Sequence, residues 1–331
     1  MTGGIDVHAH WLPTDLFGLP PGAPYGPLRD RGGELHLGEV PLSIATRAMS
    51  DVPAIRADMA EAGLALRVLS APPFAFPVAG PAPDYVDAFN DALAAVVAGS
   101  DGALAGLGLV PLDDAAAATT RLEGLAAAPG IAGVAIPPLL GGTSLDSGVL
   151  RHVLAECARL GLSVLVHPMQ LPRPEWGGHY LANLIGNPVE TATAVAALLL
   201  GGVLDALPGL RICFVHGGGC TPGLLGRWDH GWRTRPDVRR DSGRPPGEAV
   251  RDLWFDTVTH DPALLGLLTE RAGKQAVVCG SDYPFDMAQR DPLGFATGGG
   301  LDVATLSANA RAFLGRAPEP GQSRTGASGP S

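Results

Sequence analysis

The chain has 331 residues and a formal net charge of −10, because 33 Asp and Glu outnumber 23 Lys and Arg. This acidic balance argues against a nucleic-acid partner, since a phosphate backbone attracts clustered Lys and Arg. Hydrophobic residues make up 46% of the chain, which excludes a disordered protein that cannot bury apolar surface. The length suits either two domains or one α/β barrel.

Lysine and cysteine usage limits the chemistry of the chain. Lys274 is the only lysine, so a Schiff base or a carboxylated lysine has a single candidate residue. The four cysteines form no C-x-x-C pair, and so few thiols in a chain of this length do not predict a disulfide framework.

No segment of the sequence predicts export or membrane insertion. The N-terminal residues lack the basic and apolar regions of a secretory signal. The longest apolar run, residues 192–204, is interrupted by Gly201 and Gly202 and is too short to span a bilayer. We therefore expect a cytoplasmic protein without a membrane partner.

Eight short apolar runs recur along the chain, each closed by polar residues, glycine or proline. Runs of about four to eight apolar residues between turn signals predict strands that are buried on both faces. The predicted strands are residues 5–9, 64–71, 103–110, 131–136, 162–167, 211–216, 253–258 and 275–281.

Helical segments separate these strands. Asn187 is the predicted N-cap of the longest helix, with Pro188 in its first position and Glu190 as the capping carboxylate. Eight alternations of strand and helix predict a (β/α)₈ TIM barrel, with an open doubly wound sheet as the alternative. The other predicted helices cover residues 52–62, 83–98, 114–128, 147–160, 261–272 and 302–314.

Two segments fall outside the alternation. Residues 11–41 are rich in glycine and proline and follow the first strand, so they predict a small lid insertion at the carboxyl end of the barrel. Residues 316–331 have no large apolar side chain to pack and predict a disordered tail. The barrel domain is therefore expected to cover residues 1–315.

Histidines and one aspartate mark the carboxyl ends of four predicted strands. His8 and His10 end the first strand and share one side of it, because side chains alternate along a strand. His167 and His216 end the fifth and sixth strands, and the eighth strand runs into Asp282. Barrel active sites are built at this end of the strands, so we expect the five side chains to meet there.

A metal site is the chemistry that this residue set favours. Three imidazoles and one carboxylate suit a divalent ion such as zinc, with an open position for water. The remaining histidine, His216, can then act as an acid or base. Histidines packed in the core are the alternative, which is weakened because four of the nine histidines lie at one rim.

Four motifs occur in the order IDVHAH, LVHP, FVHGGG and GSDYPF, and this order resembles the amidohydrolase superfamily. Together with residues 187–210 and 226–236, the motifs are most similar to the branch that contains 2-amino-3-carboxymuconate-6-semialdehyde decarboxylase. The resemblance implies that His8, His10, His167 and Asp282 bind zinc and that His216 is the catalytic acid or base. Manganese is less favoured, because manganese-preferring relatives often have Glu at the position of His8.

The single lysine bears on the number of metal ions. Binuclear members of the superfamily bridge two metals with a carboxylated lysine on the fourth strand, but residues 131–136 contain none. Lys274 precedes the last strand and is expected at the opposite face of the barrel. We therefore expect one metal ion per subunit.

The resemblance also implies arginines that bind a substrate carboxylate. Arg47 matches, within one residue of register, an arginine upstream of the second strand. Arg227 and Arg235 match arginines that reach across a homodimer interface into the neighbouring site. A guanidinium group suits bidentate binding of a carboxylate, and surface ion pairs are the alternative for each residue.

Four further residues are expected to line the pocket. Trp11 and Phe285 come directly after metal-ligand motifs. Met169 and Asn183 stand where the family usually has tryptophans, so the pocket is altered while the metal motifs are intact.

Together with the metal site, the resemblance therefore implies a zinc-dependent, non-oxidative decarboxylase of an unsaturated or aromatic carboxylate, such as an aminocarboxymuconate semialdehyde-like compound. No organic cofactor is expected, because the metal-bound water and His216 supply the acid–base chemistry. A metal-dependent hydrolase or hydratase of a lactone, amide or enol acid is the alternative on the same scaffold. A barrel that only binds a ligand is a third possibility, which would need a broken metal set.

Overall fold

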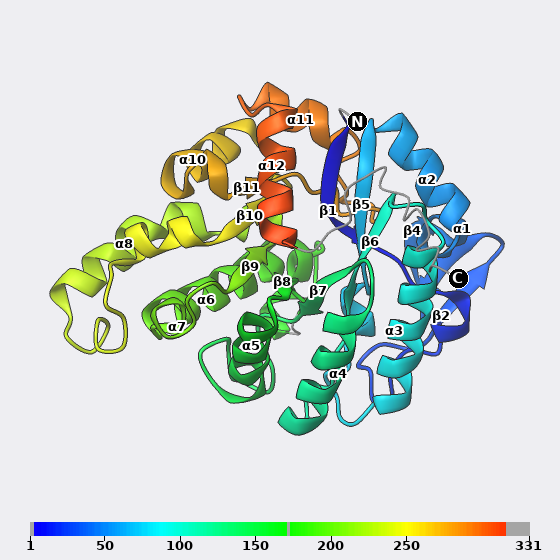
Figure 1. Ribbon diagram of the computed structural model, residues 1–331, viewed down its shortest axis with the longest axis horizontal. Coiled ribbons are helices and arrows are strands. Elements are labelled where there is room, and N and C mark those ends of the chain that lie inside the picture. The colour runs from blue at the N-terminus through cyan, green and yellow to red at the C-terminus, as the bar shows by residue number, and fades with distance from the viewer. Residues whose placement is uncertain (1–2, 171–172, 316–331) are drawn as a thin grey trace, which may run out of the picture.

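The computed structural model describes residues 3–170 and 173–315, which form a barrel of eight parallel strands with helices around it (Figure 1). The strands neighbour one another in chain order and overlap all eight predicted strands. The (β/α)₈ prediction is thus confirmed, and the open doubly wound sheet is wrong. The strands are β1 Gly4–His10, β5 Leu64–Ser70, β6 Leu104–Gly108, β7 Ile131–Ile136, β8 Ser163–Val166, β9 Arg211–Phe214, β10 Trp254–Asp256 and β11 Val277–Val278.

The barrel closes where the segment around β11 meets β1. The backbone N–H of Val7 donates to the carbonyl oxygen of Cys279 at 2.9 Å, and the backbone N–H of His10 donates to the carbonyl oxygen of Tyr283 at 2.7 Å. These hydrogen bonds join the first and last strands of the barrel, so the residues that follow β11 lie beside the end of β1. The predicted tail, residues 316–331, lies outside the described residues.

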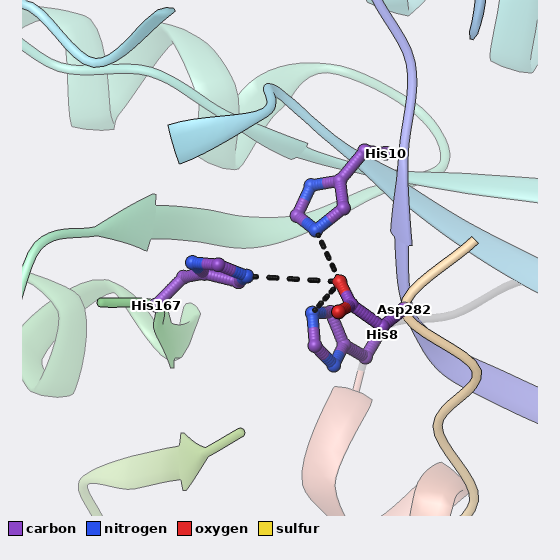
Figure 2. Close-up of side chains that lie close together, drawn as sticks. All are labelled: His8, His10, His167 and Asp282. Atoms are coloured by element: carbon purple, nitrogen blue, oxygen red, sulfur yellow. Dashed lines mark hydrogen bonds and ion pairs between the residues drawn. The ribbon is translucent and has the colours of Figure 1, made fainter. Parts of the chain in front are cut away.

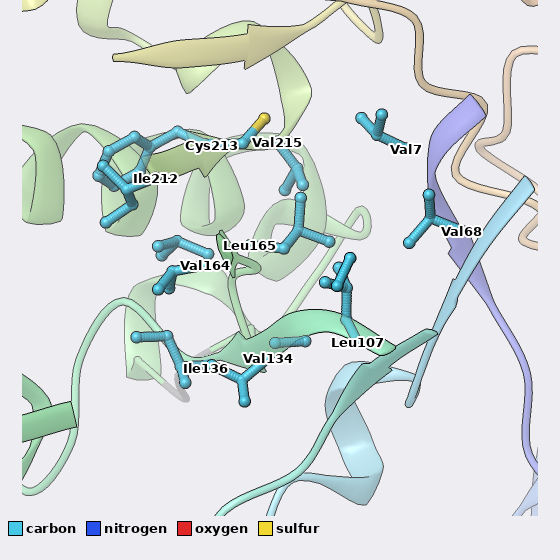
Figure 3. Packing of buried hydrophobic residues seen from close by; sticks show 14 of the residues in the cluster. Val7, Val68, Leu107, Val134, Ile136, Val164, Leu165, Ile212, Cys213 and Val215 are labelled. Carbon is cyan, nitrogen blue, oxygen red and sulfur yellow. The ribbon is translucent and has the colours of Figure 1, made fainter. Parts of the chain in front are cut away.

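Apolar side chains from neighbouring strands pack together in the hydrophobic core (Figure 3). Val7, Val68, Leu107, Val134 and Val164 come from five different strands and have no exposed surface. Burying such a side chain stabilises the fold by about 1.5–3 kcal/mol, so the strand ends are held in fixed positions.

The helices cover the outside of the barrel. Asp114, Asp261 and Asp302 cap α4 (Ala115–Ala127), α10 (Pro262–Ala272) and α12 (Val303–Leu314), because each carboxylate accepts a hydrogen bond from a backbone N–H of the first turn. Among the described residues, none of the helices has both the length and the apolar composition that crossing a membrane requires. The helices are α1 Thr46–Ser50, α2 Val52–Glu61, α3 Pro83–Ala98, α4 Ala115–Ala127, α5 Gly148–Leu160, α6 Asn187–Leu200, α7 Val203–Ala206, α8 Thr221–Thr234, α9 Pro246–Ala249, α10 Pro262–Ala272, α11 Pro292–Gly298 and α12 Val303–Leu314.

The start of α6 differs from the prediction. Asn187 is not an N-cap, because the π-helical segment Ala182–Gly186 runs directly into α6. The side chain of Asn187 accepts a hydrogen bond from the backbone of Gln170 at 3.2 Å, and Glu190 accepts one from Met169 at 2.9 Å. Both side chains therefore hold the loop after β8. The helix is also not the longest, since it has 14 residues and α3 has 16.

The insertion after β1 contains a small antiparallel sheet of three strands. These strands are β2 Leu28–Arg31, β3 Glu34–Leu37 and β4 Val40–Ala45, so the sheet continues past the predicted boundary at residue 41. The hydroxyl of Tyr25 donates to the carbonyl oxygen of Met169 at 3.0 Å. This contact ties the insertion to the loop after β8, at the carboxyl end of the barrel.

Candidate metal centre and active site

Three histidines and one aspartate converge at the carboxyl end of the barrel (Figure 2). His8 and His10 lie on β1, His167 directly follows β8, and Asp282 follows β11. One possible ligand atom from each residue lies within 4.8 Å of the others, and all four residues are buried. We call these four residues the ligand group; they are the four metal ligands that the sequence predicted.

The Nδ1 atom of each histidine in the ligand group is engaged outside the group. In His8 it lies 2.6 Å from Oδ2 of Asp256, and in His10 and His167 it lies 3.2 and 2.7 Å from backbone carbonyl oxygens. The Nε2 atoms therefore face Asp282 (Figure 2). Among the described residues, Nε2 of His8 and of His167 is buried without a hydrogen-bond partner. Imidazole nitrogens that converge on one carboxylate oxygen in this way fit a metal ion.

Burial and mutual charge determine protonation in the ligand group. Burial lowers the pKa of His10 and lowers the pKa of His167 to about 3. Burial also opposes the charged form of His8, but the carboxylates of Asp282 and Asp256 outweigh it and raise the pKa of His8 to about 10. Burial opposes ionisation of Asp282 as well, yet the charge of His8 holds the pKa of this carboxyl well below its usual range. The group thus favours a positive charge at its centre, which a metal ion can supply.

His216, the predicted acid or base, lies directly beside the ligand group. Its Nε2 is 3.4 Å from Oδ2 of Asp282, and its ring centroid is 5.2 Å from that of His167. The backbone of His216 has φ +56°, and the three glycines at 217–219 also have positive φ. A Cβ at Gly219 would collide with the carbonyl oxygen of Pro188, so glycine allows the backbone after His216 to approach the start of α6 closely.

Asp256, at the end of β10, is a site residue that the sequence analysis did not single out. It is fully buried, and besides contacting His8 it accepts a hydrogen bond from the backbone N–H of Gly217 at 2.8 Å. One carboxylate thus orients a ligand and the backbone that follows His216. The available signal was that Asp256 is the one charged residue in the predicted strand 253–258, because a buried charge requires partners.

Two cavities open beside His216 and Asp282. The lid-side cavity, of about 380 Å³, is lined by residues of the insertion and by Met169, Asn183 and Phe285. The α8-side cavity, of about 600 Å³, also includes Asn183. Three residues predicted to line the pocket therefore do so, and the ring of Phe285 lies 5.0 Å from that of its neighbour His10.

Trp11 belongs to the core, so its predicted place in the pocket wall is wrong. Its side chain is buried, its indole N–H donates to the carbonyl oxygen of Ser50 at 3.1 Å, and its ring packs against Phe89. Since His8 and His10 point into the barrel mouth, the residue after His10 takes the opposite side of the chain.

The three predicted arginines are exposed and lie outside the ligand group of a single chain. Arg47, on α1, lines a separate surface hollow with Thr46. Arg227 lies on α8, which projects from the barrel (Figure 1), and Arg235 follows this helix and pairs with Asp237 at 2.8 Å. Their contacts with a substrate carboxylate stay predictions.

Known proteins share both the sequence pattern and the fold of this chain. A family model described as Amidohydrolase matches residues 5–316. The chain belongs to the amidohydrolase family. It is 32% identical over 211 residues to 2-amino-3-carboxymuconate-6-semialdehyde decarboxylase from Dictyostelium discoideum, which covers 63% of this chain and 59% of that protein. It is 31% identical over 146 residues to 6-methylsalicylic acid decarboxylase from Penicillium expansum, with 44% and 45% of the two chains covered.

The match therefore spans less than two thirds of the length of these two relatives. Structural similarity covers more of this chain than the two sequence matches do. A crystal structure of 5-carboxyvanillate decarboxylase from Novosphingobium aromaticivorans, complexed with manganese and 4-hydroxy-3-methoxy-5-nitrobenzoic acid, superposes with a TM-score of 0.76. It covers 94% of this chain and 96% of that one at 17% sequence identity, which establishes a shared fold.

Proposed function

We propose that this amidohydrolase is a zinc-dependent decarboxylase that releases CO₂, without oxidation, from an unsaturated or aromatic carboxylate. The observation that carries the proposal is the buried ligand group beside His216, in which the Nε2 atoms of two histidines have no hydrogen-bond partner among the described residues. The names of the three relatives, all decarboxylases, support the same reaction class.

The donors of the ligand group support a single divalent ion. His8, His10, His167 and Asp282 would hold it, and three imidazoles with one carboxylate favour zinc. When bound, the ion supplies Lewis-acid chemistry that polarises a substrate oxygen. Manganese is the competing ion, since it is present in the 5-carboxyvanillate decarboxylase structure. The sole lysine, Lys274, precedes β11 and donates to a backbone carbonyl oxygen at 3.2 Å, which supports one metal rather than a lysine-bridged pair.

His216 would manage the proton of the reaction. Loss of CO₂ breaks a carbon–carbon bond and leaves the electron pair on the substrate carbon. The imidazolium of His216 donates a proton to that carbon, which forms the C–H bond of the product, and His216 then regains a proton from solvent. The position of its Nε2, 3.4 Å from the Asp282 carboxylate, supports this role because the nitrogen borders the ligand group.

The arginines would act in a homodimer. Arg227 and Arg235 are exposed on and after α8, so a second copy of the chain is what would bring them to a neighbouring site. Arg47, on α1 directly after the insertion, is the candidate from the same chain. Each guanidinium could bind a substrate carboxylate through two hydrogen bonds.

The proposed function is tested by comparing the amount of CO₂ released with the amount of substrate consumed. Zinc-loaded protein is incubated with carboxylated muconates and hydroxybenzoates, and CO₂ and products are quantified by mass spectrometry. We expect one CO₂ for each substrate molecule consumed, and no CO₂ after chelation of the metal. Ring opening or hydration without CO₂ would instead support the hydrolase or hydratase that the same residues could serve.

A further inference from the structure

The α8-side cavity and the lid-side cavity meet at the ligand group. Five residues line both cavities: Asn183, Asn187, His216, Asp282 and Met287. A molecule whose carboxylate lies at the ligand group can therefore extend toward the lid or toward α8. The α8-side cavity offers more room, about 600 Å³ against about 380 Å³.

Apolar side chains from separate elements form the wall of the α8-side cavity. Leu224 lies on α8, Val258 follows β10 and Leu264 lies on α10. Leu184, from the π-helical segment, also lines the cavity although 48% of its surface is exposed. Covering these side chains with an apolar group would remove hydrophobic surface from water, which favours binding.

Within one chain, the α8-side cavity offers a second carboxylate no arginine or lysine among the described residues. Of the described residues that line it, Asp282 is the only Asp, Glu, Lys or Arg, and this residue belongs to the ligand group. The lid-side cavity adds another acid, Asp286. Away from its two histidines, His216 and His260, a carboxylate placed against the α8-side wall would lose water without gaining a cation from the same chain, which is unfavourable.

Two glycines of α8 allow this cavity to be probed without disturbing the fold. Gly223 lines the cavity, and a Cβ built on it meets no atom within 4 Å. Gly226 has equally open surroundings on the same helix but is not among the residues that line the cavity. Leucine favours a helix more than glycine does, so a leucine at either position is compatible with folding.

We propose that the substrate carries, besides the carboxylate that is lost, an uncharged apolar substituent that occupies the α8-side cavity. The substrate class is thus an aromatic or unsaturated acid with an alkyl or aryl group, rather than a dicarboxylate whose second carboxylate would point toward α8. This inference rests on the proposed decarboxylase function, because that function places the reacting carboxylate at the ligand group.

The test compares Gly223→Leu with the matched control Gly226→Leu. Each zinc-loaded protein receives 2-hydroxybenzoates that bear hydrogen, propyl or carboxylate at the 4-, 5- or 6-position. At one position, propyl should raise kcat/KM at least about tenfold over hydrogen, and carboxylate should lower it. Gly223→Leu should remove the propyl gain and leave the parent compound within about twofold, whereas Gly226→Leu should preserve both values.

Calorimetric titration of the same compounds separates this inference from the proposed function. A propyl advantage in Kd that Gly223→Leu removes supports the inference even when no CO₂ is released, and the missing CO₂ then counts against the decarboxylase alone. Release of CO₂ with no propyl advantage, or with an advantage that Gly223→Leu leaves intact, overturns the inference and leaves the decarboxylase standing. Absence of both binding and CO₂ release overturns both.

Discussion

The ligand group and the cavity walls around it are built from different parts of the molecule. His8 and His10 belong to a barrel strand and have no exposed surface. The walls include the insertion, the loop after β11, α8, α10 and residues in and just before the π-helical segment, where Tyr180 and Leu184 are 49% and 48% exposed. Tight packing therefore fixes the chemistry of the site, while loops with fewer constraints determine which molecule fits beside it.

Replacing a residue of the ligand group should have the largest effect on zinc affinity and CO₂ release, whereas replacing a cavity-wall residue should leave zinc affinity unchanged. His167→Ala removes one of the three imidazoles, so we expect zinc affinity to fall by more than about 100-fold and CO₂ release to reach background. The loss of affinity should exceed the loss caused by removing a residue that only hydrogen-bonds to a ligand. Equilibrium dialysis measures the affinity. Met169→Ala, a change in the wall, should leave zinc affinity unchanged; equal affinity in wild type and His167→Ala would exclude His167 as a ligand.

Replacement of His216 should separate proton transfer from metal binding. His216→Asn removes the acid or base but none of the four ligands, so CO₂ release should fall by about 10²–10⁴-fold while zinc content stays at the wild-type value. Stopped-assay CO₂ measurements and elemental analysis of one preparation provide both numbers. Near-normal turnover in this variant would assign the proton to another group.

Asp256 should act on the ligand group from outside it. Asp256→Ala removes the partner of His8 Nδ1 and the acceptor of Gly217 N–H, so zinc affinity should fall by about 10–100-fold. Asp256→Asn keeps an oxygen acceptor and should recover part of the loss. Asp261→Ala is the control: loss of the α10 cap should lower Tm and leave zinc affinity unchanged. Unchanged zinc affinity in Asp256→Ala would contradict the positioning role.

The smallest effect is expected at the insertion. Tyr25→Phe removes the hydrogen bond to the Met169 carbonyl, a contact worth about 0.5–1.5 kcal/mol. We expect KM to rise by about two- to tenfold through a looser lid-side cavity, with kcat and zinc content unchanged. Steady-state kinetics measures both constants, and a fall in zinc content would show that the lid and the ligand group are not independent.

The sequence was sufficient for the barrel and the ligand group, because both depend on local patterns. Apolar runs fix the strands, and the alternation of side chains places His8 and His10 on one face. The same rule places Trp11 on the other face, against Phe89, and the resemblance alone did not reveal this. Glu190 fits a capping pattern, but the backbone N–H of Met169 binds it in the folded chain.

The cavity walls were only partly predictable. Met169, Asn183 and Phe285 were found because they flank recognisable motifs. The arginines are different: Arg47, Arg227 and Arg235 are exposed, and a single chain contains no local pattern that specifies which neighbour an exposed side chain meets. Tertiary and quaternary contacts, rather than spacing along the chain, determine such positions.

Titration of zinc into chelator-treated protein, with CO₂ release recorded at each addition, tests whether the reaction depends on a single metal ion. CO₂ release should be absent without zinc, rise linearly with added zinc and reach its plateau at one zinc ion per chain. A plateau at two ions per chain, or CO₂ release that is independent of added metal, would contradict a single metal bound by His8, His10, His167 and Asp282.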